Sequence, residues 1–245
     1  MSLKKALNWE DVFSIIAPIM NFSCIFDWDG TVVDSGRTHE RTWIELAKRH
    51  NLPLIDNFFS ITFGKRNVEI ITQILNWTKD PACAQELSDE KEVLYRDIVV
   101  RDGVPKVGGV EEFLKNLKGA GIPCAVGSST PRLNLDVTVE KLGFGSYFQA
   151  YAASEDVSKG KPEPDVFLCA ARKLGVSPES CVVFEDSLAG IEAGVAAGMK
   201  TVALTLTNPQ NFWLGLRETP RDRTDLIIDD YLGISISDLS GLFDK

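Results

Sequence analysis

The chain has 245 residues, with 26 lysines and arginines, 35 aspartates and glutamates, and a net charge of −9 with both histidines neutral. Hydrophobic residues make up 44% of it, which excludes a disordered chain and allows a large core. The acidic balance argues against a general nucleic-acid surface, because such surfaces depend on clustered lysines and arginines. A small anionic ligand is compatible with this charge, since a few well-placed cations can hold it.

The N-terminal segment argues against a secretion signal or a membrane span. Its longest apolar run, Val12–Met20, is short, contains Pro18 and follows Glu10 and Asp11. We therefore expect residues 1–19 to form a helical extension and the protein to be cytoplasmic. The five cysteines are scattered and form no CxxC pair, so we expect reduced thiols rather than disulfides or zinc ligands.

Short β-rich runs alternate with helical patterns along most of the chain. The predicted strands are Phe22–Phe26, Pro123–Gly127, Phe148–Ala152, Cys181–Phe184, Thr201–Leu204 and Asp225–Ile228. Apolar residues between them recur at i, i+3, i+4 and i+7, which is typical of amphipathic helices. This alternation predicts an α/β fold with a mostly parallel sheet covered by helices.

One stretch breaks the alternation. From about Thr38 to Asp102 the pattern indicates helices, including one stripe of Val68, Ile71 and Leu75, and no convincing strand. We therefore predict a helical insert between the first and second strands. The late segment 207–222 has no regular pattern, and its purpose cannot be inferred from the sequence.

Pairs of acidic residues follow the first and the fourth predicted strands. Asp27 and Asp29 point to the same side of an extended chain, and Gly30 lets the chain turn away. Carboxylates that lie this close repel each other unless a cation or a lysine neutralises them. Glu185 and Asp186 follow the fourth strand. Ligands of parallel sheets bind at the carboxyl ends of the strands, so both pairs are candidates for one site.

Hydroxyl groups and a lysine follow two other strands. Ser128 and Ser129 lead to a helix start, where we predict Thr130 as the N-cap and Pro131 as the first helical residue. Lys161 also precedes a helix, where its charge opposes the helix dipole. Together with the acids, these groups suit a hard cation, phosphate oxygens and a nucleophilic aspartate.

Four motifs in this order resemble those of the haloacid dehalogenase superfamily of phosphotransferases. They are DWDGT from Asp27, GSST from Gly127, KGKPEPD around Lys161 and FEDSLAGIEAG from Phe184. The resemblance covers roughly residues 20–235. It is greatest to the branch with an α-helical cap inserted after the first motif, which includes β-phosphoglucomutase and phosphoglycolate phosphatase.

The resemblance implies a domain organisation. The fold would be α/β, with a Rossmann-like, doubly wound parallel-sheet core formed by residues 20–36 and 107–245. An inserted α-helical cap would comprise residues 37–106, close over the substrate and exclude bulk water.

The resemblance also implies roles for the residues at the strand ends. Asp27 would attack phosphorus and form an aspartyl-phosphate, and Asp29 would act as general acid and then as general base. The implied Mg²⁺ ligands are Asp27, Asp29 through its backbone carbonyl, Asp186 and, as a ligand or close neighbour, Glu185. The implied phosphate-binding residues are Ser128, Ser129 and Lys161.

Candidates for substrate contact lie mostly in the predicted cap. They are His39, Lys65, Arg66 and, beside the second motif, Arg132. In the mutases of this branch the counterpart of His39 lies near the acid/base aspartate, and Lys91 matches a mutase cap lysine. Trp43 and Trp77 fit the interior of the cap better than a substrate platform.

The implied function is a Mg²⁺-dependent phosphatase that hydrolyses a small phosphomonoester, a sugar phosphate or similar. A β-phosphoglucomutase-type phosphosugar mutase is the alternative. In that mutase a lysine soon follows the second-motif serine, whereas Arg132 lies here one position out of register, which favours hydrolysis. A non-catalytic binding protein is disfavoured because every motif residue is present. We expect a monomer that binds a small phosphorylated metabolite and neither nucleic acid nor membrane.

Overall fold

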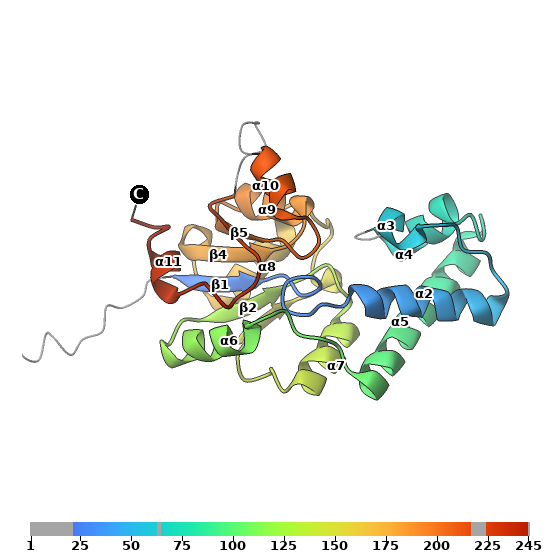
Figure 1. Cartoon of the computed structure of the whole chain (residues 1–245), viewed down its shortest axis with the longest axis horizontal. Helices are drawn as coiled ribbons and strands as arrows, with labels where there is room; N and C mark the ends of the chain where they lie inside the picture. The colour runs from blue at the N-terminus through green and yellow to red at the C-terminus, as the bar shows by residue number, and fades with distance from the viewer. Residues whose placement is uncertain (1–21, 63–64, 217–223, 245) are drawn as a thin grey trace, which may run out of the picture.

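The computed structural model describes residues 22–62, 65–216 and 224–244. The predicted N-terminal helical extension, residues 1–19, lies outside the described residues. Within them the chain forms two parts, a core built on a sheet and a group of helices that extends away from it (Figure 1). None of the described helices is long and apolar enough to cross a bilayer.

The core is built on a six-stranded parallel sheet with the strand order β3-β2-β1-β4-β5-β6. The strands are β1 (Ser23–Phe26), β2 (Cys124–Gly127), β3 (Ala150–Ala152), β4 (Cys181–Glu185), β5 (Lys200–Leu204) and β6 (Leu226–Ile228). All six predicted strands are present, although β3 begins at Ala150 and not at Phe148. The chain winds outward in both directions from β1, which confirms the doubly wound α/β core.

Helices cover both faces of the sheet. They are α6 (Val110–Gly119), α7 (Arg132–Leu142), α8 (Asp165–Leu174), α9 (Leu188–Ala196), α10 (Gln210–Leu216) and α11 (Ile236–Ser240). Alternate residues of β1 point to opposite faces, so Phe26 packs with Phe113 of α6 and Ile25 packs with Phe167 of α8. The buried sheet is thereby fixed between two apolar layers, and its carboxyl edge stays available for polar side chains.

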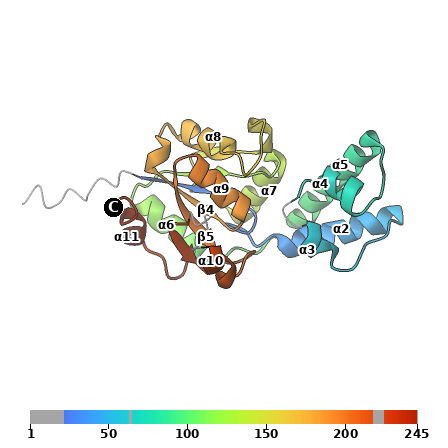
Figure 2. The same cartoon turned by 90° about the horizontal axis from the view of Figure 1, so that it is seen from above.

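The helical insert follows β1 directly. It contains α2 (Gly36–His50), α3 (Phe58–Thr62), α4 (Asn67–Glu69), a π-helix (Ile70–Ile74) and α5 (Pro81–Asp102). Figures 1 and 2 show α2 and α5 side by side, beyond one edge of the core. The expected stripe of Val68, Ile71 and Leu75 is not one α-helix, because α4 ends after three residues and Val68 is exposed.

The insert has a core of its own and is also tied to the sheet domain. Trp43, Leu46 and Ile71 pack together inside it, as expected for Trp43, while Trp77 is half-buried against this cluster. Helix α5 packs on α7, and its residue Tyr95 joins the apolar layer of the sheet. The assignment of residues 37–106 to the cap stays a prediction.

The cysteines behave as expected from their sequence context. All five are free, and Cys24, Cys124, Cys169 and Cys181 are buried. Burial raises the pKa of the Cys24 thiol well above its ordinary value, which makes it unreactive.

Candidate active site

A cavity of about 780 Å³ lies where the carboxyl ends of the strands face the helical insert. The core contributes residues that follow β1, β2 and β4, and the insert contributes residues of α2, α4 and α5. A cavity of this size suits a small organic ligand. The geometry therefore brings the sequence motifs of the core and the cap candidates to one place.

Asp27 and Lys161 form a buried ion pair at the floor of this cavity. The Lys161 ammonium lies 2.5 Å from Asp27 Oδ1 and 2.7 Å from Glu185 Oε1. Burial raises the pKa of Asp27 to about 7, although the Lys161 charge opposes the rise. Burial also lowers the pKa of Lys161, but Asp27 and Glu185 outweigh this and hold it above its ordinary value. Lys161 is therefore a fixed cation beside Asp27.

Three buried acids converge at this point. Asp27, Glu185 and Asp186 each offer a carboxylate oxygen within 4.8 Å of the others. Burial and the charges of Glu185 and Asp27 raise the pKa of Asp186 well above its ordinary value. Three carboxylates beside the Lys161 ammonium leave surplus negative charge, and oxygen donors are what Mg²⁺ prefers. The donor set therefore fits a hard divalent cation.

Residues of the late irregular segment hold Asp186. The Thr207 hydroxyl donates to Asp186 Oδ2, and the Asn208 amide donates to the Asp186 backbone carbonyl at 3.0 Å. Gly30 lies on the other side, and its positive φ of 81° is one that side chains rarely adopt. A Cβ on Gly30 would lie 1.9 Å from Asp186 Oδ2. Sequence reasoning missed Thr207 and Asn208, because nothing local marks them.

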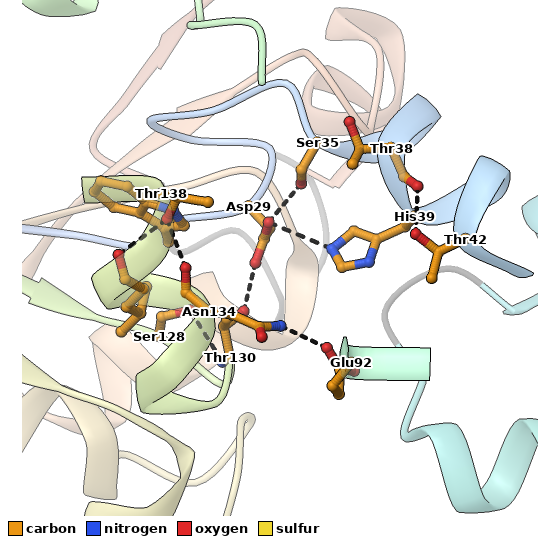
Figure 3. A network of polar contacts seen from close by, with 12 residues as sticks. Asp29, Ser35, Thr38, His39, Thr42, Glu92, Ser128, Thr130, Asn134 and Thr138 are labelled. Carbon is orange, nitrogen blue, oxygen red and sulfur yellow. Dashed lines mark hydrogen bonds and ion pairs between the residues drawn. The ribbon is translucent and has the colours of Figure 1, made fainter. Parts of the chain in front are cut away.

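Asp29 is not one of the three clustered acids and has its own set of donors, which Figure 3 shows. The Ser35 hydroxyl donates to Asp29 Oδ1 at 2.5 Å, and the Thr130 hydroxyl donates to Oδ2. His39 Nε2 lies 3.5 Å from Oδ1. Burial raises the pKa of Asp29, but the hydrogen bonds that His39, Ser35 and Thr130 donate outweigh it and leave the pKa below its ordinary value. Asp29 is thus held as a carboxylate.

His39 joins Asp29 to the helical insert. Lys91 Nζ contacts His39 Nδ1 at 3.0 Å, and the Tyr95 ring stacks on the imidazole with centroids 4.3 Å apart. An ammonium can only donate, so Nδ1 accepts and the imidazole proton lies on Nε2, toward Asp29. Burial and the Lys91 charge lower the pKa of His39. The insert therefore presents a neutral, oriented imidazole to Asp29.

The second motif differs in detail from the sequence expectation. Helix α7 begins at Arg132 with Pro131 as its N-cap, one residue later than predicted. Thr130 is not the cap, because its hydroxyl is used by Asp29. Ser128 is buried and lines the cavity, and its hydroxyl oxygen accepts from the Thr130 backbone N–H at 3.1 Å. Ser129 also lines the cavity but is exposed.

The remaining cap candidates fall into two groups. Lys65 and Arg66 are exposed and line the cavity, opposite the strand ends. Arg132 does not line it: its guanidinium donates to Asp136 at 2.8 Å and lies over the Tyr151 ring. The start of α7 thus directs the Arg132 side chain to the surface, and its role in substrate contact stays a prediction.

Replacing Gly190 of α9 with alanine is expected to disturb the packing of Glu185 at this site. Glu185 is packed so closely on α9 that a Cβ at Gly190 would lie 1.8 Å from Glu185 Oε1, the oxygen that contacts Lys161. We expect the free energy of unfolding to fall by about 1–3 kcal/mol, which chemical denaturation will measure. Gly119→Ala is the control, because nothing lies within 4 Å of that Cβ. Equal stability of both variants would contradict the packing described here.

Family comparison defines the class of this protein. The sequence model of the haloacid dehalogenase-like hydrolases matches residues 23–198, which include all four motifs. The chain therefore belongs to the haloacid dehalogenase-like hydrolase family, as its sequence predicts.

Individual relatives agree with this assignment. Hexitol phosphatase A of Escherichia coli is 28% identical over 87% of this chain and 93% of its own length. Fructose-1-phosphate phosphatase YqaB of the same organism is 33% identical, over 74% and 95%. The chloroplastic 5-amino-6-(5-phospho-D-ribitylamino)uracil phosphatase of Arabidopsis thaliana is 32% identical over 88% of this chain, which spans 58% of that protein. All three are named phosphatases, which supports the expected enzyme class.

Solved structures confirm the fold. A haloacid dehalogenase hydrolase of family IA, variant 3, from Entamoeba histolytica superimposes with a TM-score of 0.81 at 28% identity. The match covers 91% of this chain and all of that one. A β-phosphoglucomutase from Clostridium difficile matches with a TM-score of 0.74 at 21% identity, over 91% and 96%. The expected combination of a doubly wound core with an inserted helical cap is therefore confirmed.

Proposed function

We propose that this protein is a Mg²⁺-dependent phosphatase that hydrolyses a small phosphomonoester through an aspartyl-phosphate on Asp27. The observation that carries the proposal is the different treatment of two aspartates beside one cavity. Asp27 lies in the acidic cluster against Lys161, whereas Asp29 is removed from that cluster and held by Ser35, Thr130 and His39. This difference supports nucleophilic attack by Asp27 and proton transfer by Asp29.

In the first step, an Asp27 carboxylate oxygen forms a bond to phosphorus, and the bond from phosphorus to the substrate oxygen breaks. The Lys161 ammonium neutralises charge on the phosphoryl oxygens, and Ser128 and Ser129, which line the same cavity, bind these oxygens with it. The leaving oxygen takes a proton from Asp29, and the second step returns a proton to Asp29 from water. Asp29 carries this proton only in transit, since its donors favour the ionised form.

In the second step, the Asp29 carboxylate takes a proton from water as the water attacks the phosphorus bound to Asp27. The donors on Asp29 favour the ionised form, which is the form that this step requires. His39 keeps that carboxylate oriented through its Nε2 proton. Hydrolysis thus returns Asp27 to its starting state.

The divalent cation fits the same place. Asp27 and Asp186 would hold Mg²⁺ together with the Asp29 backbone carbonyl, and Glu185 lies beside them. When bound, the cation supplies positive charge for the phosphoryl oxygens and relieves the repulsion between the buried carboxylates.

The relatives and the cavity support one class of substrate. Two relatives are named for hexitol phosphates and fructose 1-phosphate, and the cavity offers cations as well as polar groups of the insert. We therefore propose a phosphorylated sugar or sugar alcohol as the substrate, with the enzyme acting as a cytoplasmic monomer.

A phosphosugar mutase is the second candidate. The contact of Lys91 with His39, and of His39 with Asp29, favours it, because the implied mutase counterparts occupy these positions. Arg132 points away from the cavity and offers no substitute for the mutase lysine. This difference favours hydrolysis.

Phosphate release from a panel of phosphomonoesters, with Mg²⁺ or with EDTA, tests the proposal. We expect release from sugar phosphates with Mg²⁺ and release at the level of the Asp27→Asn blank with EDTA, because the buried carboxylates would then face the phosphate uncompensated. Slow release from every ester, together with bisphosphate-primed conversion of β-glucose 1-phosphate to glucose 6-phosphate, would indicate the mutase. Full activity in EDTA would contradict the metal dependence.

A further inference from the structure

A buried asparagine of the core is enclosed by two charged residues of the helical insert. Asn134 lies on α7 and is 1% exposed. Its amide nitrogen donates to Glu92 Oε2 at 2.5 Å (Figure 3). Its amide oxygen accepts from Arg96 Nη1 at 2.8 Å. Glu92 and Arg96 lie one turn apart on α5. One side chain of the core thus binds two successive turns of the cap helix.

The chemistry of these partners allows only one orientation of the amide. A guanidinium can only donate and an ionised carboxylate can only accept, so the amide must present its oxygen to Arg96 and its nitrogen to Glu92. Burial raises the pKa of Glu92, but the Lys91 charge and the donors Asn67 and Asn134 outweigh it and keep the pKa below its ordinary value. Glu92 is therefore the charged acceptor that this pairing requires.

The Glu92 carboxylate is also connected to Asp29, through Lys91 and His39. Glu92 Oε1 accepts from Lys91 at 2.9 Å and from Asn67 at 2.6 Å, and Lys91 contacts His39 beside Asp29. Lys91 is itself buried, 3% exposed, so it depends on Glu92 for charge compensation. Glu92 thus has one oxygen on the core and the other on the lysine that orients His39.

Asn134 is also anchored to the first motif through its backbone. The Trp28 indole N–H donates to Thr138 Oγ1 at 2.8 Å, and that hydroxyl donates to the Asn134 carbonyl at 2.9 Å. Trp28 stands between Asp27 and Asp29 in the chain. The position of Asn134 is therefore fixed relative to both aspartates by a buried hydrogen-bonded path.

We propose that Asn134 is the docking residue that locks the cap helix on the core, and that it is thereby a positioning residue for the Asp29 proton transfer. When Glu92 and Arg96 engage its amide, Lys91 is held against His39, and His39 is held against Asp29. Without this contact, α5 keeps the exposed hydrogen bond from Lys141 of α7 to its Val100 carbonyl, at 2.7 Å, but loses its buried polar attachment beside the site. Lys91 is then no longer held against His39, and the imidazole loses the partner that selects its Nε2 proton. The inference rests on the proposed function.

A swap of hydrogen-bond polarity tests this proposal. Asn134→Asp sets a carboxylate against Glu92. Glu92→Gln replaces one of two accepting oxygens with an amide N–H₂, which must then face either the Asn134 amide nitrogen or the donors Lys91 and Asn67. We expect each single variant to lower kcat for a sugar phosphate by about tenfold or more. In the double variant the amide introduced at position 92 can donate to the carboxylate introduced at position 134, and this carboxylate still accepts from Arg96. The value of kcat should therefore return to within about threefold of the wild type. Asn116→Asp, an exposed change on α6, is the matched control for added charge.

The leaving group separates positioning from general damage. p-Nitrophenolate leaves without a proton, so Asn134→Asp should lower kcat for the sugar phosphate more than for p-nitrophenyl phosphate. Equal losses on both substrates, a double variant no better than the single ones, or an unchanged Asn134→Asp enzyme would each overturn the proposal.

Hydrogen exchange keeps the docking contact testable without turnover. Asn134→Asp should speed amide exchange in residues 88–98 of α5, and the double variant should slow it again. If the wild type hydrolyses no ester while exchange follows this pattern, the proposed function fails and the docking contact stands. Unchanged exchange in Asn134→Asp would overturn the docking contact itself.

Discussion

Replacing Asp27 with asparagine should reduce phosphate release to background, a loss on the order of 10³-fold or more. The amide cannot form the acyl-phosphate bond, and the Lys161 ammonium, 2.5 Å from Asp27 Oδ1, loses one of its two carboxylates. Phosphate release with Mg²⁺ measures the effect. Asp136→Asn is the control, because Asp136 is exposed and does not line the cavity. Retention of activity by Asp27→Asn would show that another residue attacks phosphorus.

This variant should stay folded. The wild-type cluster has three buried carboxylates beside Lys161, and the substitution removes one of them while Glu185 still pairs with the lysine. The thermal midpoint in EDTA should therefore be at least as high as that of the wild type. Mg²⁺ should raise the wild-type midpoint more than that of the variant, because the variant offers fewer charged ligands. A midpoint far below the wild type in EDTA would contradict this account of the cluster.

Replacing Asp29 with asparagine should divide the reaction into its two halves. An alkyl phosphate needs a proton on its leaving oxygen, so its hydrolysis should fall by about 10²–10⁴-fold. p-Nitrophenyl phosphate needs none, so it should still phosphorylate Asp27. Because the base for water is missing, one p-nitrophenolate per enzyme should appear in a burst, followed by slow turnover.

Rapid mixing measures this burst, and Asp27→Asn should show none. The three donors on Asp29 include the Ser35 and Thr130 hydroxyls, which can rotate to suit an amide, so the variant should fold normally. Unchanged steady-state turnover of an alkyl phosphate by Asp29→Asn would contradict the acid/base role. Slow turnover of the aromatic ester without a burst would contradict the covalent step.

The core motifs could be predicted from the sequence because their signals are local. Each follows a short apolar run, and parallel strands bring their carboxyl ends to one edge of the sheet. Asp27, Lys161, Glu185 and Asp186 are therefore brought together once the strands are recognised. Strand ends and helix starts were less well predicted, as at Pro131, because they depend on which side chains take up the free backbone groups.

The partners of these residues come from distant parts of the chain. Thr207 reaches Asp186 from 21 residues away, Asn134 reaches Glu92 across 42, and Lys91 reaches His39 across 52. No local pattern marks Thr207 or Asn134, and His39 and Lys91 were recognised only through the family resemblance. The π-helix in the insert and the outward direction of Arg132 are equally invisible to periodicity.

The sequence by itself thus identifies the reacting groups, because their signals are local: an apolar strand, a glycine at the turn after it, and charged residues beside that turn. The orientation of those groups was settled by packing between elements. How α5 lies on α7 decides whether Glu92 meets Asn134, and the excursion after β5 decides whether Thr207 meets Asp186. Such contacts depend on the docking of whole helices, and hydrophobic periodicity specifies which face of a helix is buried but not which polar residues then meet.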